Sequence, residues 1–263
     1  MKNADILKEI LTKKKERIAL AKLGIPEEEL KERVKGLPPA RPFIEAINKP
    51  RQISLIAEIK KASPSQGVIR EDFHHIEIAK AYQDSGVQAI SVLTEEDFFL
   101  GNIAYINEVK NLTTVPVLRK DFILDPYQIY ESRFYGADAI LLIASLLTQD
   151  EIVQFSTIAT ELGMDSLVEV HNEKELKKVL KLKGISLIGI NNRDLRTLEV
   201  DPKTVEKLFP LIPKDKAVVV ESGIKTAQDV LFLKILGVSA VLIGTAFMQS
   251  EDISKKVEEI MGW

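Results

Sequence analysis

The stretch AISVLTEEDFFLGNIAYINEVKNLTTVPVL, residues 89–118, contains the repeating unit that decides the fold. It begins with a short apolar run rich in β-branched residues (89–93), continues into a helical pattern (103–111) and ends in a second apolar run (115–118). Strand runs that are apolar throughout, rather than alternating, indicate parallel strands covered on both faces. The stretch therefore predicts one strand–helix–strand unit of a parallel sheet.

Eight such strand–helix units follow one another from residue 53 onward. Glycine-containing turns such as Ser85-Gly86-Val87 lead several helices into the next strand, because glycine supplies the left-handed cap that this connection needs. The predicted strands are 53–59, 89–93, 115–118, 139–143, 166–170, 187–190, 217–220 and 240–243. The predicted helices are 76–85, 103–111, 126–135, 149–162, 173–182, 202–209, 227–236 and 250–261.

Eight consecutive units predict an α/β fold, a single (β/α)8 TIM barrel. A doubly wound parallel sheet is the alternative. That fold usually carries a glycine-rich dinucleotide turn after its first strand, and GxGxxG is absent from the sequence. We therefore expect one domain over residues 1–263, with a barrel over 49–263 and a helical N-terminal extension over 1–48.

The extension has the pattern of an amphipathic helix over residues 5–20, followed by a short helix at 43–48. Its apolar face consists of Ile6, Leu7, Ile10 and Leu11. The lysine run at 13–15 could suggest an anionic partner, but we interpret it as a solvated helix face. The extension is too short to bury a core of its own.

Composition limits the classes of function. The 263 residues are 45% hydrophobic, and 36 Lys+Arg against 39 Asp+Glu give a net charge of −3, which excludes both disorder and an overall basic field for nucleic acid. The chain has no cysteine, which excludes disulfides, thiolate zinc sites and a cysteine nucleophile. Its three histidines, His74, His75 and His171, do not suggest a metal centre. His74 and His75 fit the start of a helix, and we interpret His171 as a helix-entry or surface residue.

No targeting or membrane-spanning segment is visible. The longest apolar run, residues 139–147, is far below the roughly 20 residues that span a bilayer. The N-terminus alternates apolar and charged residues and lacks the continuous apolar stretch of a signal peptide. We therefore expect a cytoplasmic protein without a membrane partner.

Charged and polar residues gather where the predicted strands end, the position at which barrels of this kind carry their chemistry. Acidic side chains within apolar strands are costly to bury unless they are paired, and Lys60 and Lys120 are the natural partners. Glu58 and Lys60 are two residues apart, so their side chains point to the same side of the strand. The strand-end residues are Glu58, Lys60, Lys120, Glu169, Asn191, Arg193 and Glu221.

Two glycine-containing turns predict a phosphate site. Ser222-Gly223 follows the seventh strand and Gly244-Thr245 follows the eighth, the usual phosphate-binding corner of the fold. The loop at 62–68, after the first strand, contains Pro and Gly and is either a mobile lid or a static connector.

Seven motifs together resemble the indole-3-glycerol phosphate synthase family. The resemblance runs through every strand in order and includes the helical extension, so it covers essentially the whole chain. The motifs are IAEIKKASPS (56–65), ISVLTEEDFFLG (90–101), VLRKDFILDPYQI (117–129), LVEVHN (167–172), IGINNRDLRTLEVD (188–201), VVESGI (219–224) and LIGTAFM (242–248).

The resemblance implies the activity and the catalytic groups. The family converts 1-(2-carboxyphenylamino)-1-deoxyribulose 5-phosphate to indole-3-glycerol phosphate, CO₂ and water, with no cofactor or metal. Lys120 resembles its general acid, and Glu169 resembles a second acid–base residue that serves the dehydration. Lys60 resembles a cation that holds the substrate, oriented by Glu58. Asn191 and Glu221 match polar positions around the sugar hydroxyls.

The resemblance also implies the binding residues. Arg193 matches a family arginine, and Phe122, Leu141 and Leu195 match apolar positions around the anthranilate ring. The matching phosphate contacts are Ser63, Ser222, Gly223, Gly244 and Thr245. We expect a monomer whose N-terminal helix lies across the catalytic mouth, beside the 62–68 loop.

Two other readings remain open at this point. One is another phosphosugar barrel, such as the isomerase or the synthase α-subunit of the same pathway. A resemblance to the isomerase would require a catalytic cysteine, and the chain has none. The other is a non-catalytic subunit that binds a phosphorylated ligand. Altered charges at the strand ends would favour this reading, whereas the charges in this sequence are intact.

Overall fold

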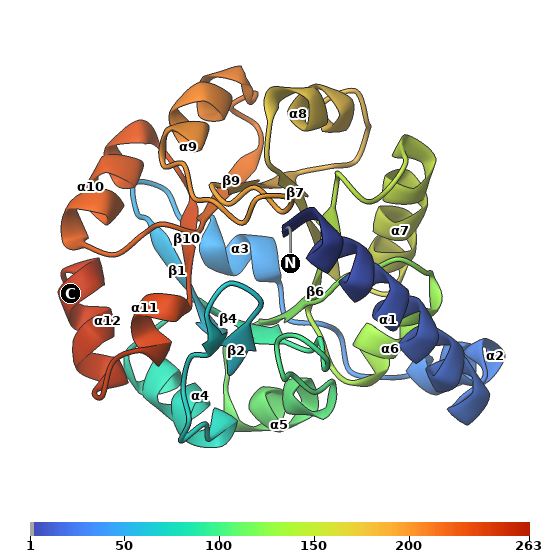
Figure 1. Ribbon diagram of the computed structural model, residues 1–263. Coiled ribbons are helices and arrows are strands. Elements are labelled where there is room, and N and C mark those ends of the chain that lie inside the picture. Colours follow the sequence, from blue (N-terminus) through green and yellow to red (C-terminus); the bar gives the residue numbers. More distant parts are fainter. Residues whose placement is uncertain (1–2) are drawn as a thin grey trace.

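Eight parallel strands close into a barrel in the computed structural model, which describes residues 3–263 (Figure 1). Each strand pairs with the next along the chain, and the last returns to the first, which places Ala57 beside Ile243. The order has no reversal, so the predicted (β/α)8 barrel is confirmed and the doubly wound sheet is excluded. The strands are β1 (Ser54–Ile59), β4 (Ala89–Leu93), β5 (Val117–Lys120), β6 (Ala139–Ile143), β7 (Asp165–Val170), β8 (Leu187–Asn191), β9 (Ala217–Glu221) and β10 (Ala240–Ile243).

All eight predicted barrel helices are present, with bounds shifted by a few residues, and they surround the sheet in Figure 1. Local signals define their starts: Thr148 and Thr226 each cap a helix with a reciprocal capping box. The helices are α4 (His75–Asp84), α5 (Ala104–Leu112), α6 (Tyr127–Phe134), α7 (Gln149–Glu161), α8 (Glu173–Val179), α9 (Lys203–Leu208), α10 (Ala227–Leu236) and α12 (Ile253–Met261).

Three short elements lie in the connections and were not predicted. A hairpin of β2 (Ala62–Ser63) and β3 (Gly67–Val68) follows β1, in the loop interpreted as a lid or a connector. The one-turn helix α11 (Thr245–Met248) follows β10, and a 3₁₀ turn, η1 (Phe209–Leu211), follows α9. The additions after β1 and β10 both lie at the carboxyl end of the barrel.

The N-terminal extension contains three helices: α1 (Asn3–Gly24), α2 (Glu27–Val34) and α3 (Phe43–Ile47). The sequence predicted the first and the last but not α2, which begins directly after Pro26 and packs on α6. Proline is well tolerated at the start of a helix but not in its interior, which separates α1 from α2. Across residues 3–263, no helix is both long and apolar enough to cross a membrane.

The extension contributes to both ends of the barrel interior. Phe43 and Ile47 of α3 are fully buried in the apolar cluster inside the barrel. The backbone N–H of Ile44 donates to Asp165, where β7 begins, at 2.9 Å, so α3 closes the amino-terminal end. Ile10 of α1 belongs to the same cluster and lies at the opposite end, where the strands finish.

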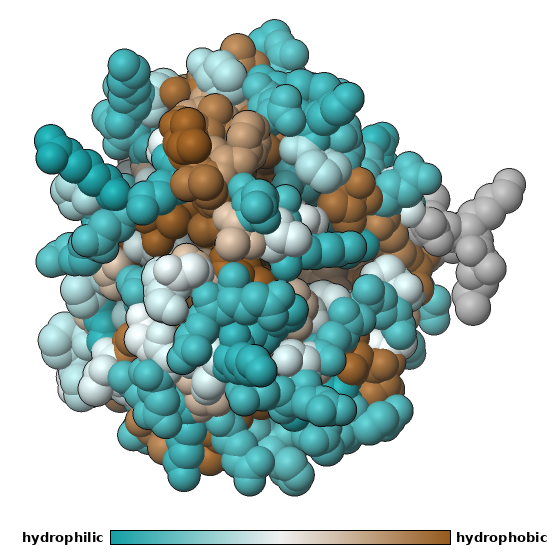
Figure 2. All heavy atoms as spheres, turned by 90° about the vertical axis from the view of Figure 1, so that its left-hand side faces the viewer, coloured by the Kyte–Doolittle hydropathy of each residue, from teal (hydrophilic) through white to brown (hydrophobic). Residues whose placement is uncertain are grey.

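The outer face of α10 is apolar. Leu231, Phe232 and Ile235 expose 55%, 46% and 77% of their surface, while Val230 and Leu233 of the same helix are buried. Figure 2 views the molecule from the side on which α10 lies and shows apolar side chains gathered in the upper half of this face. Apolar residues therefore occupy both sides of this helix.

Candidate active site

A cavity of about 1180 Å³ opens at the carboxyl end of the barrel. Strand ends form its floor, and the β2–β3 hairpin and α1 contribute to its walls. Every residue predicted for the site lines this cavity. These residues are Glu58, Lys60, Ser63, Lys120, Phe122, Leu141, Glu169, Asn191, Arg193, Leu195, Glu221, Ser222, Gly223, Gly244 and Thr245.

Lys120 lies between two carboxylates from other strands. Its Nζ atom is 2.7 Å from Oε2 of Glu221 and 3.5 Å from Oε2 of Glu169. Burial alone would lower the pKa of Lys120, but the carboxylates of Glu221, Glu169 and Glu58 outweigh burial and raise it. Lys120 is therefore a charged ammonium group that can donate a proton.

Glu58 and Lys60 form a second pair on β1 and the residue that follows it. Lys60 Nζ lies 2.6 Å from Oε1 of Glu58. Burial would raise the pKa of Glu58, but Lys60 and Lys120 outweigh it and lower the pKa. A Cβ atom on Gly244 would lie 2.4 Å from this same oxygen, so only glycine lets the last strand end approach the Glu58 carboxylate.

The pKa values of the two carboxylates beside Lys120 are shifted in opposite directions. The charges of Lys120 and His171 outweigh burial at Glu169 and lower its pKa. Burial dominates at Glu221 and raises its pKa, and the neighbouring Glu169 adds to this effect. Within residues 3–263, Oε1 of Glu221 has no hydrogen-bond partner, which leaves it available to a bound hydroxyl group. Gly189 gives this oxygen room, because a Cβ atom there would lie 3.0 Å away.

Asn191 fixes the position of Glu169. Its amide Nδ2 donates to Oε2 of Glu169 at 3.0 Å, and its Oδ1 accepts the backbone N–H of Arg193 at 3.0 Å. The guanidinium group of Arg193 donates to the carbonyl of Leu198 at 2.7 Å and lines the cavity. The end of β8 thus holds both a cation and the orienting partner of a carboxylate.

The loop after β9 has a backbone shape that needs its glycine. Ser222 and Gly223 have φ angles of 66° and 82°, and a Cβ atom on Gly223 would lie 2.8 Å from Val200 Cγ1. Lys225 and Lys256 also line the cavity and were not predicted from the sequence. Lys225 could have been found from its place three residues after Ser222, whereas Lys256 lies on α12 and carried no such signal.

The N-terminal helix forms part of the cavity wall, as predicted. Ile6, Leu7 and Ile10 line the cavity together with the predicted ring-binding residues Phe122 and Leu195. These apolar residues form one wall, while the strand-end charges form the floor. The cavity can therefore hold a molecule with an apolar ring and several charged groups.

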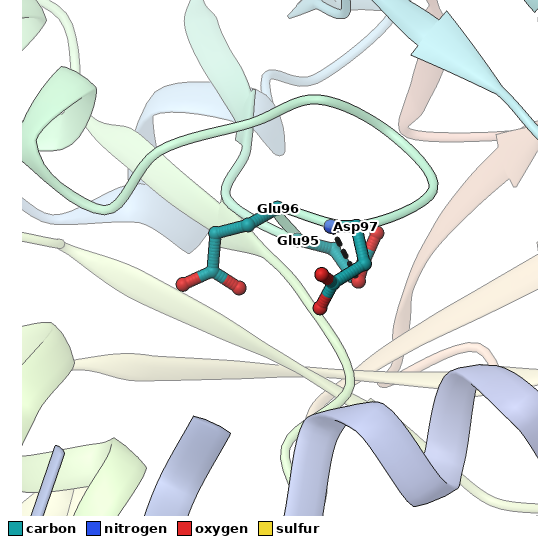
Figure 3. A group of neighbouring side chains, drawn as sticks. All are labelled: Glu95, Glu96 and Asp97. Atoms are coloured by element: carbon teal, nitrogen blue, oxygen red, sulfur yellow. Dashed lines mark hydrogen bonds between the residues drawn. The ribbon is translucent and has the colours of Figure 1, made fainter. Parts of the chain in front are cut away.

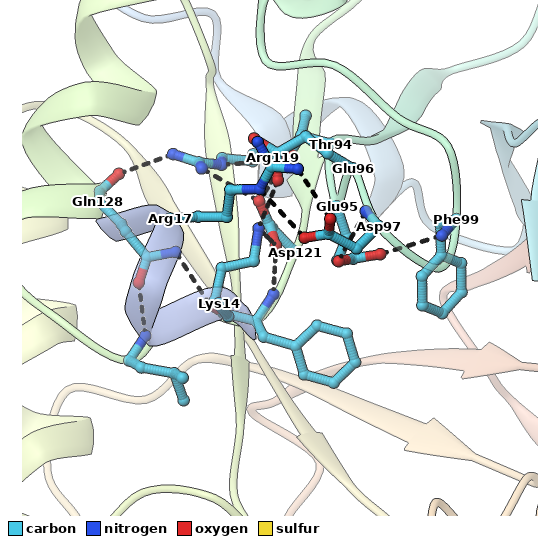
Figure 4. Close-up of polar contacts among 12 residues, drawn as sticks. Lys14, Arg17, Thr94, Glu95, Glu96, Asp97, Phe99, Arg119, Asp121 and Gln128 are labelled. Atoms are coloured by element: carbon cyan, nitrogen blue, oxygen red, sulfur yellow. Dashed lines mark hydrogen bonds and ion pairs between the residues drawn. The ribbon is translucent and has the colours of Figure 1, made fainter. Parts of the chain in front are cut away.

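The interpretation of the lysine run as a solvated face is wrong for Lys14 (Figure 4). Its side chain is 3% exposed, and Nζ lies 2.8 Å from Asp121 Oδ1 and 3.3 Å from Glu96 Oε2. Lys14 comes four residues after Ile10 and four before Ile18, both buried, so helical periodicity places it on the buried stripe. Its neighbours Lys13 and Lys15 are exposed, as expected.

Asp121 connects the N-terminal helix to the strand that carries Lys120. Its Oδ2 accepts hydrogen bonds from the Thr94 hydroxyl at 2.6 Å and from Arg119 at 3.1 Å. Its Oδ1 accepts the backbone N–H of Phe122 at 2.8 Å in addition to the Lys14 ion pair. Helix α1 is thus bound to the residue that directly follows the candidate acid (Figure 4).

Three neighbouring carboxylates follow β4, with oxygen atoms within 4.8 Å of one another (Figure 3). Glu95 accepts the backbone N–H groups of Asp97, Phe98 and Phe99. Glu96 pairs with Lys14, and Asp97 pairs with Arg17 at 2.7 Å. These contacts shape the loop and bind it to α1, and they account for the whole cluster.

Lys14→Met should loosen α1 and so weaken substrate binding. Removing one partner of a buried ion pair typically costs about 3–5 kcal/mol of unfolding free energy, and we expect the lower end because Arg119 still neutralises Asp121. The Michaelis constant should rise more than kcat falls, because the helix forms the cavity wall. Lys15→Met, on the exposed face, is the matched control. Equal Michaelis constants in the two variants would show that the buried pair does not hold the wall in place.

The prediction of His171 as a helix-entry or surface residue is confirmed for the helix entry, because it directly precedes the Asn172 cap of α8, and is wrong for the surface. The residue lies between β7 and α8, but its side chain is 5% exposed and lies between Glu169 and Glu175. Nε2 is 3.1 Å from Glu169 Oε1, and Nδ1 is 3.0 Å from Glu175 Oε2. The spacing could have revealed this arrangement, since Glu169 lies two residues before His171 and Glu175 four residues after it.

The fold and the site together define a class: a (β/α)8-barrel enzyme whose cavity, at the carboxyl end of the strands, is lined by lysine and glutamate side chains. The sequence matches the family model described as indole-3-glycerol phosphate synthase over residues 7–260. The chain belongs to the indole-3-glycerol phosphate synthase family and is thus a carboxy-lyase of tryptophan biosynthesis.

Relatives in this family cover nearly the full length. The indole-3-glycerol phosphate synthase of Acetivibrio thermocellus is 51% identical over 256 residues, 97% of this chain and 98% of that protein. The enzyme of Caldanaerobacter subterraneus subsp. tengcongensis is 56% identical over 222 residues, 84% of this chain and 86% of that protein.

Solved structures at low identity share the fold. A mutant tryptophan synthase α-subunit from Pyrococcus furiosus has a TM-score of 0.61 at 19% identity, covering 80% of this chain and 98% of that one. A 3-hexulose-6-phosphate synthase has a TM-score of 0.64 at 15% identity, covering 80% and 99%. At such identities the likeness concerns the barrel alone.

Proposed function

We propose that the chain closes the indole ring of 1-(2-carboxyphenylamino)-1-deoxyribulose 5-phosphate with Lys120 as the general acid. The observation that carries this proposal is the ammonium group of Lys120, held between Glu221 and Glu169 on the floor of the cavity. As the ring carbon attacks the sugar carbonyl, Lys120 gives a proton to the carbonyl oxygen, which becomes a hydroxyl group. The substrate carboxylate then leaves as CO₂.

The second half of the reaction removes that hydroxyl group as water, and Glu169 is the group proposed to serve this step. It lies on the same side of the barrel as Lys120, and Asn191 fixes its position. The unpartnered oxygen of Glu221 is proposed to bind a sugar hydroxyl, together with Asn191. Lys60, oriented by Glu58, is proposed to hold the substrate carboxylate before it leaves.

The two ends of the substrate match the two walls of the cavity. The anthranilate ring is proposed to lie against Phe122, Leu141 and Leu195, near the Arg193 cation. The phosphate is proposed to bind the loops after β9 and β10 and the hairpin after β1, where lysines add positive charge. Its proposed contacts are Ser63, Ser222, Gly223, Gly244 and Thr245.

We further propose that one chain is a complete catalytic unit that works in the cytoplasm without cofactor, metal, nucleic acid or membrane. All the groups assigned above come from a single chain and line a single cavity. The acid–base chemistry needs only side chains whose protonation the site already controls.

Incubation with the substrate should produce the fluorescence of the indole product. A dephosphorylated substrate should react with a much higher Michaelis constant, because each charge-assisted hydrogen bond to phosphate contributes about 1.5–3 kcal/mol. Steady-state fluorescence assays on both compounds measure the two effects. Absence of product would contradict the proposed reaction, and equal Michaelis constants would contradict the proposed phosphate site.

A further inference from the structure

His171 is enclosed by two carboxylates, one inside the active site and one outside it. Glu169 faces Nε2, and Glu175 on α8 faces Nδ1. The imidazole ring does not line the cavity, whereas Glu169 does. The side chains of His171 and Glu175 are 5% and 15% exposed, so the row of three groups leads from the cavity toward the outside of the barrel.

The outer carboxylate of this row is held rigidly. Glu175 Oε2 accepts the backbone N–H of His171 at 2.8 Å, and Oε1 accepts the amide of Asn172 at 2.6 Å. The Asn172 side chain in turn accepts the backbone N–H of Glu175 at 3.0 Å, as the cap of α8. A carboxylate fixed in this way accepts hydrogen bonds, so Nδ1 of His171 carries a proton and donates it to Glu175.

The inner side of the ring must then hold a second proton. Nε2 of His171 and Oε1 of Glu169 are 3.1 Å apart, at ion-pair distance without hydrogen-bond alignment, and Nε2 is buried with no hydrogen-bond partner among residues 3–263. With Nδ1 already protonated, a neutral imidazole would place the lone pair of Nε2 3.1 Å from an oxygen of an ionised carboxylate, which is repulsive. One proton therefore belongs to the His171–Glu169 pair, on one atom or the other.

We propose that His171 is the proton donor to Glu169 in the dehydration step, with Glu175 as the group that holds the imidazole ring in place. This inference rests on the proposed role of Glu169. It adds a residue that receives its proton from solvent and acts through Glu169 without touching the substrate.

Glu169 needs a source for the proton that it delivers in the dehydration step. Glu169 is held as a carboxylate by Lys120 and His171, and an ionised carboxylate has no proton to give to a departing hydroxyl group. In the dehydration step the Nε2–H proton of His171 passes first to Oε1 of Glu169, which becomes a neutral carboxylic acid. Glu169 then gives this proton to the hydroxyl group, the carbon–oxygen bond breaks, water leaves, and Glu169 is a carboxylate again. The neighbouring ring carbon loses its proton to Lys120, which became a neutral amine at ring closure. A solvent proton then returns to Nε2. This uptake matches the overall balance, in which a substrate carboxylate and one proton give the product, CO₂ and water.

The charges around the pair favour this arrangement. Glu169 is faced by Lys120 on β5, Asn191 on β8, Glu221 on β9 and Glu58 on β1. Glu175, on the other side of the ring, is acted on by the charges of Lys178 and Arg196. Burial alone would lower the pKa of His171, but Glu169 and Glu175 raise it to about 10, so the imidazole is charged at neutral pH.

The test compares His171→Gln with the intact chain. Glutamine can hydrogen-bond to both carboxylates but cannot transfer a proton, so we expect kcat to fall by about tenfold or more, with little change in the Michaelis constant. The lower limit is below the usual range of about 10²–10⁴-fold for acid–base groups, because Glu169 can still take a proton from solvent. The matched control is His75→Gln, which alters the other histidine–carboxylate pair, with Glu108 on the outer surface. Wild-type kcat in His171→Gln would overturn the proposal.

The pH profile separates proton donation from positioning. In the intact chain, kcat should fall as the pH rises through the pKa of His171, near 10. In His171→Gln, Glu169 must take its proton directly from solvent, so this fall should begin at lower pH. Imidazole added to His171→Ala should restore part of kcat. If the fall of kcat at high pH, the basic limb of the profile, lies at the same pH in His171→Gln as in the intact chain, the proposal is also overturned.

Two further variants keep the outcome clear. Glu175→Gln keeps the imidazole but removes its outer charge, so the basic limb should again move to lower pH, although by less. It tests the proposal even where substitution of His171 prevents folding, and an unmoved limb would then overturn it. Glu169→Gln tests the proposed function itself, because full activity in that variant would show that Glu169 takes no part in the reaction. If Glu169→Gln is inactive while His171→Gln keeps wild-type activity, the role proposed for Glu169 stands and only the role proposed for His171 is overturned.

Discussion

Lys120→Met should lower kcat by about 10²–10⁴-fold, the range usual for loss of a general acid. Methionine fills a similar volume but has no proton to give to the carbonyl oxygen as the ring closes. Ring closure should therefore fail while substrate still binds, because Lys60 and the phosphate loops are unchanged. Single-turnover measurements of CO₂ release and indole fluorescence should both show the loss, since CO₂ leaves only after the ring has closed.

The control for this prediction is Lys61→Met, which removes a lysine that follows Lys60 but does not line the cavity. Its kinetics should match those of the intact chain. The thermal unfolding midpoint of both variants should be recorded, because methionine leaves Glu221 and Glu169 on the cavity floor without the cation that lies between them. Turnover by Lys120→Met at the wild-type rate, at any pH, would remove this residue from the mechanism.

Glu169→Gln should separate the two halves of the reaction. Ring closure and CO₂ release need Lys120, whereas loss of water needs a proton at Glu169, which glutamine cannot deliver. We expect the formation of indole to slow by about 10²–10⁴-fold, while the first equivalent of CO₂ still appears rapidly. In a rapid-quench experiment with equal amounts of enzyme and substrate, the rate of CO₂ release is compared with the rate of indole formation.

Glu161→Gln, at the exposed end of α7, is the neutral control for the same chemical change. Equal slowing of CO₂ and indole in Glu169→Gln would contradict a role confined to dehydration. It would instead place Glu169 in ring closure together with Lys120.

Most of the fold could be predicted from the sequence, because the deciding signals are local. Apolar runs, helical periodicity and glycine turns each lie within about a dozen residues, and the eight units follow from them. The third strand shows the limit of this approach: it was expected over 115–118 and lies at Val117–Lys120. Proline at 116 lacks the N–H that a central strand needs, and Arg119 is buried among acidic and polar groups that the sequence does not place beside it.

The buried face of α10 illustrates the same limit. Its apolar pattern predicted a helix, but apolar residues lie on both sides, so periodicity alone could not say that Val230 faces the core and Ile235 faces outward. The packing of the neighbouring strands and helices decides this orientation, and a local pattern does not contain it.

The candidate site was predictable where strand ends and family motifs coincide, and not where a partner is distant. Lys14 was assigned to a solvated face and His171 to a helix entry or the surface, because a lone charged or titratable residue is usually solvated. Lys14 is buried because Asp121 and Glu96, far along the chain, meet it. Composition and periodicity cannot reveal a counter-ion that lies as far along the chain from Lys14 as Glu96 and Asp121 do.

The binding of α1 to the loops after β4 and β5 has a consequence for how the chain is made. Lys22 pairs with Asp125, which lies 103 positions later, so the first helix leaves the ribosome long before its partner exists. At about 5–20 residues per second, this interval lasts roughly 5–20 s. For most of it Lys14 lacks Glu96, and for nearly all of it Lys14 lacks Asp121. Helix α1 must therefore wait until the chain has been made as far as Asp125 before all its contacts can form.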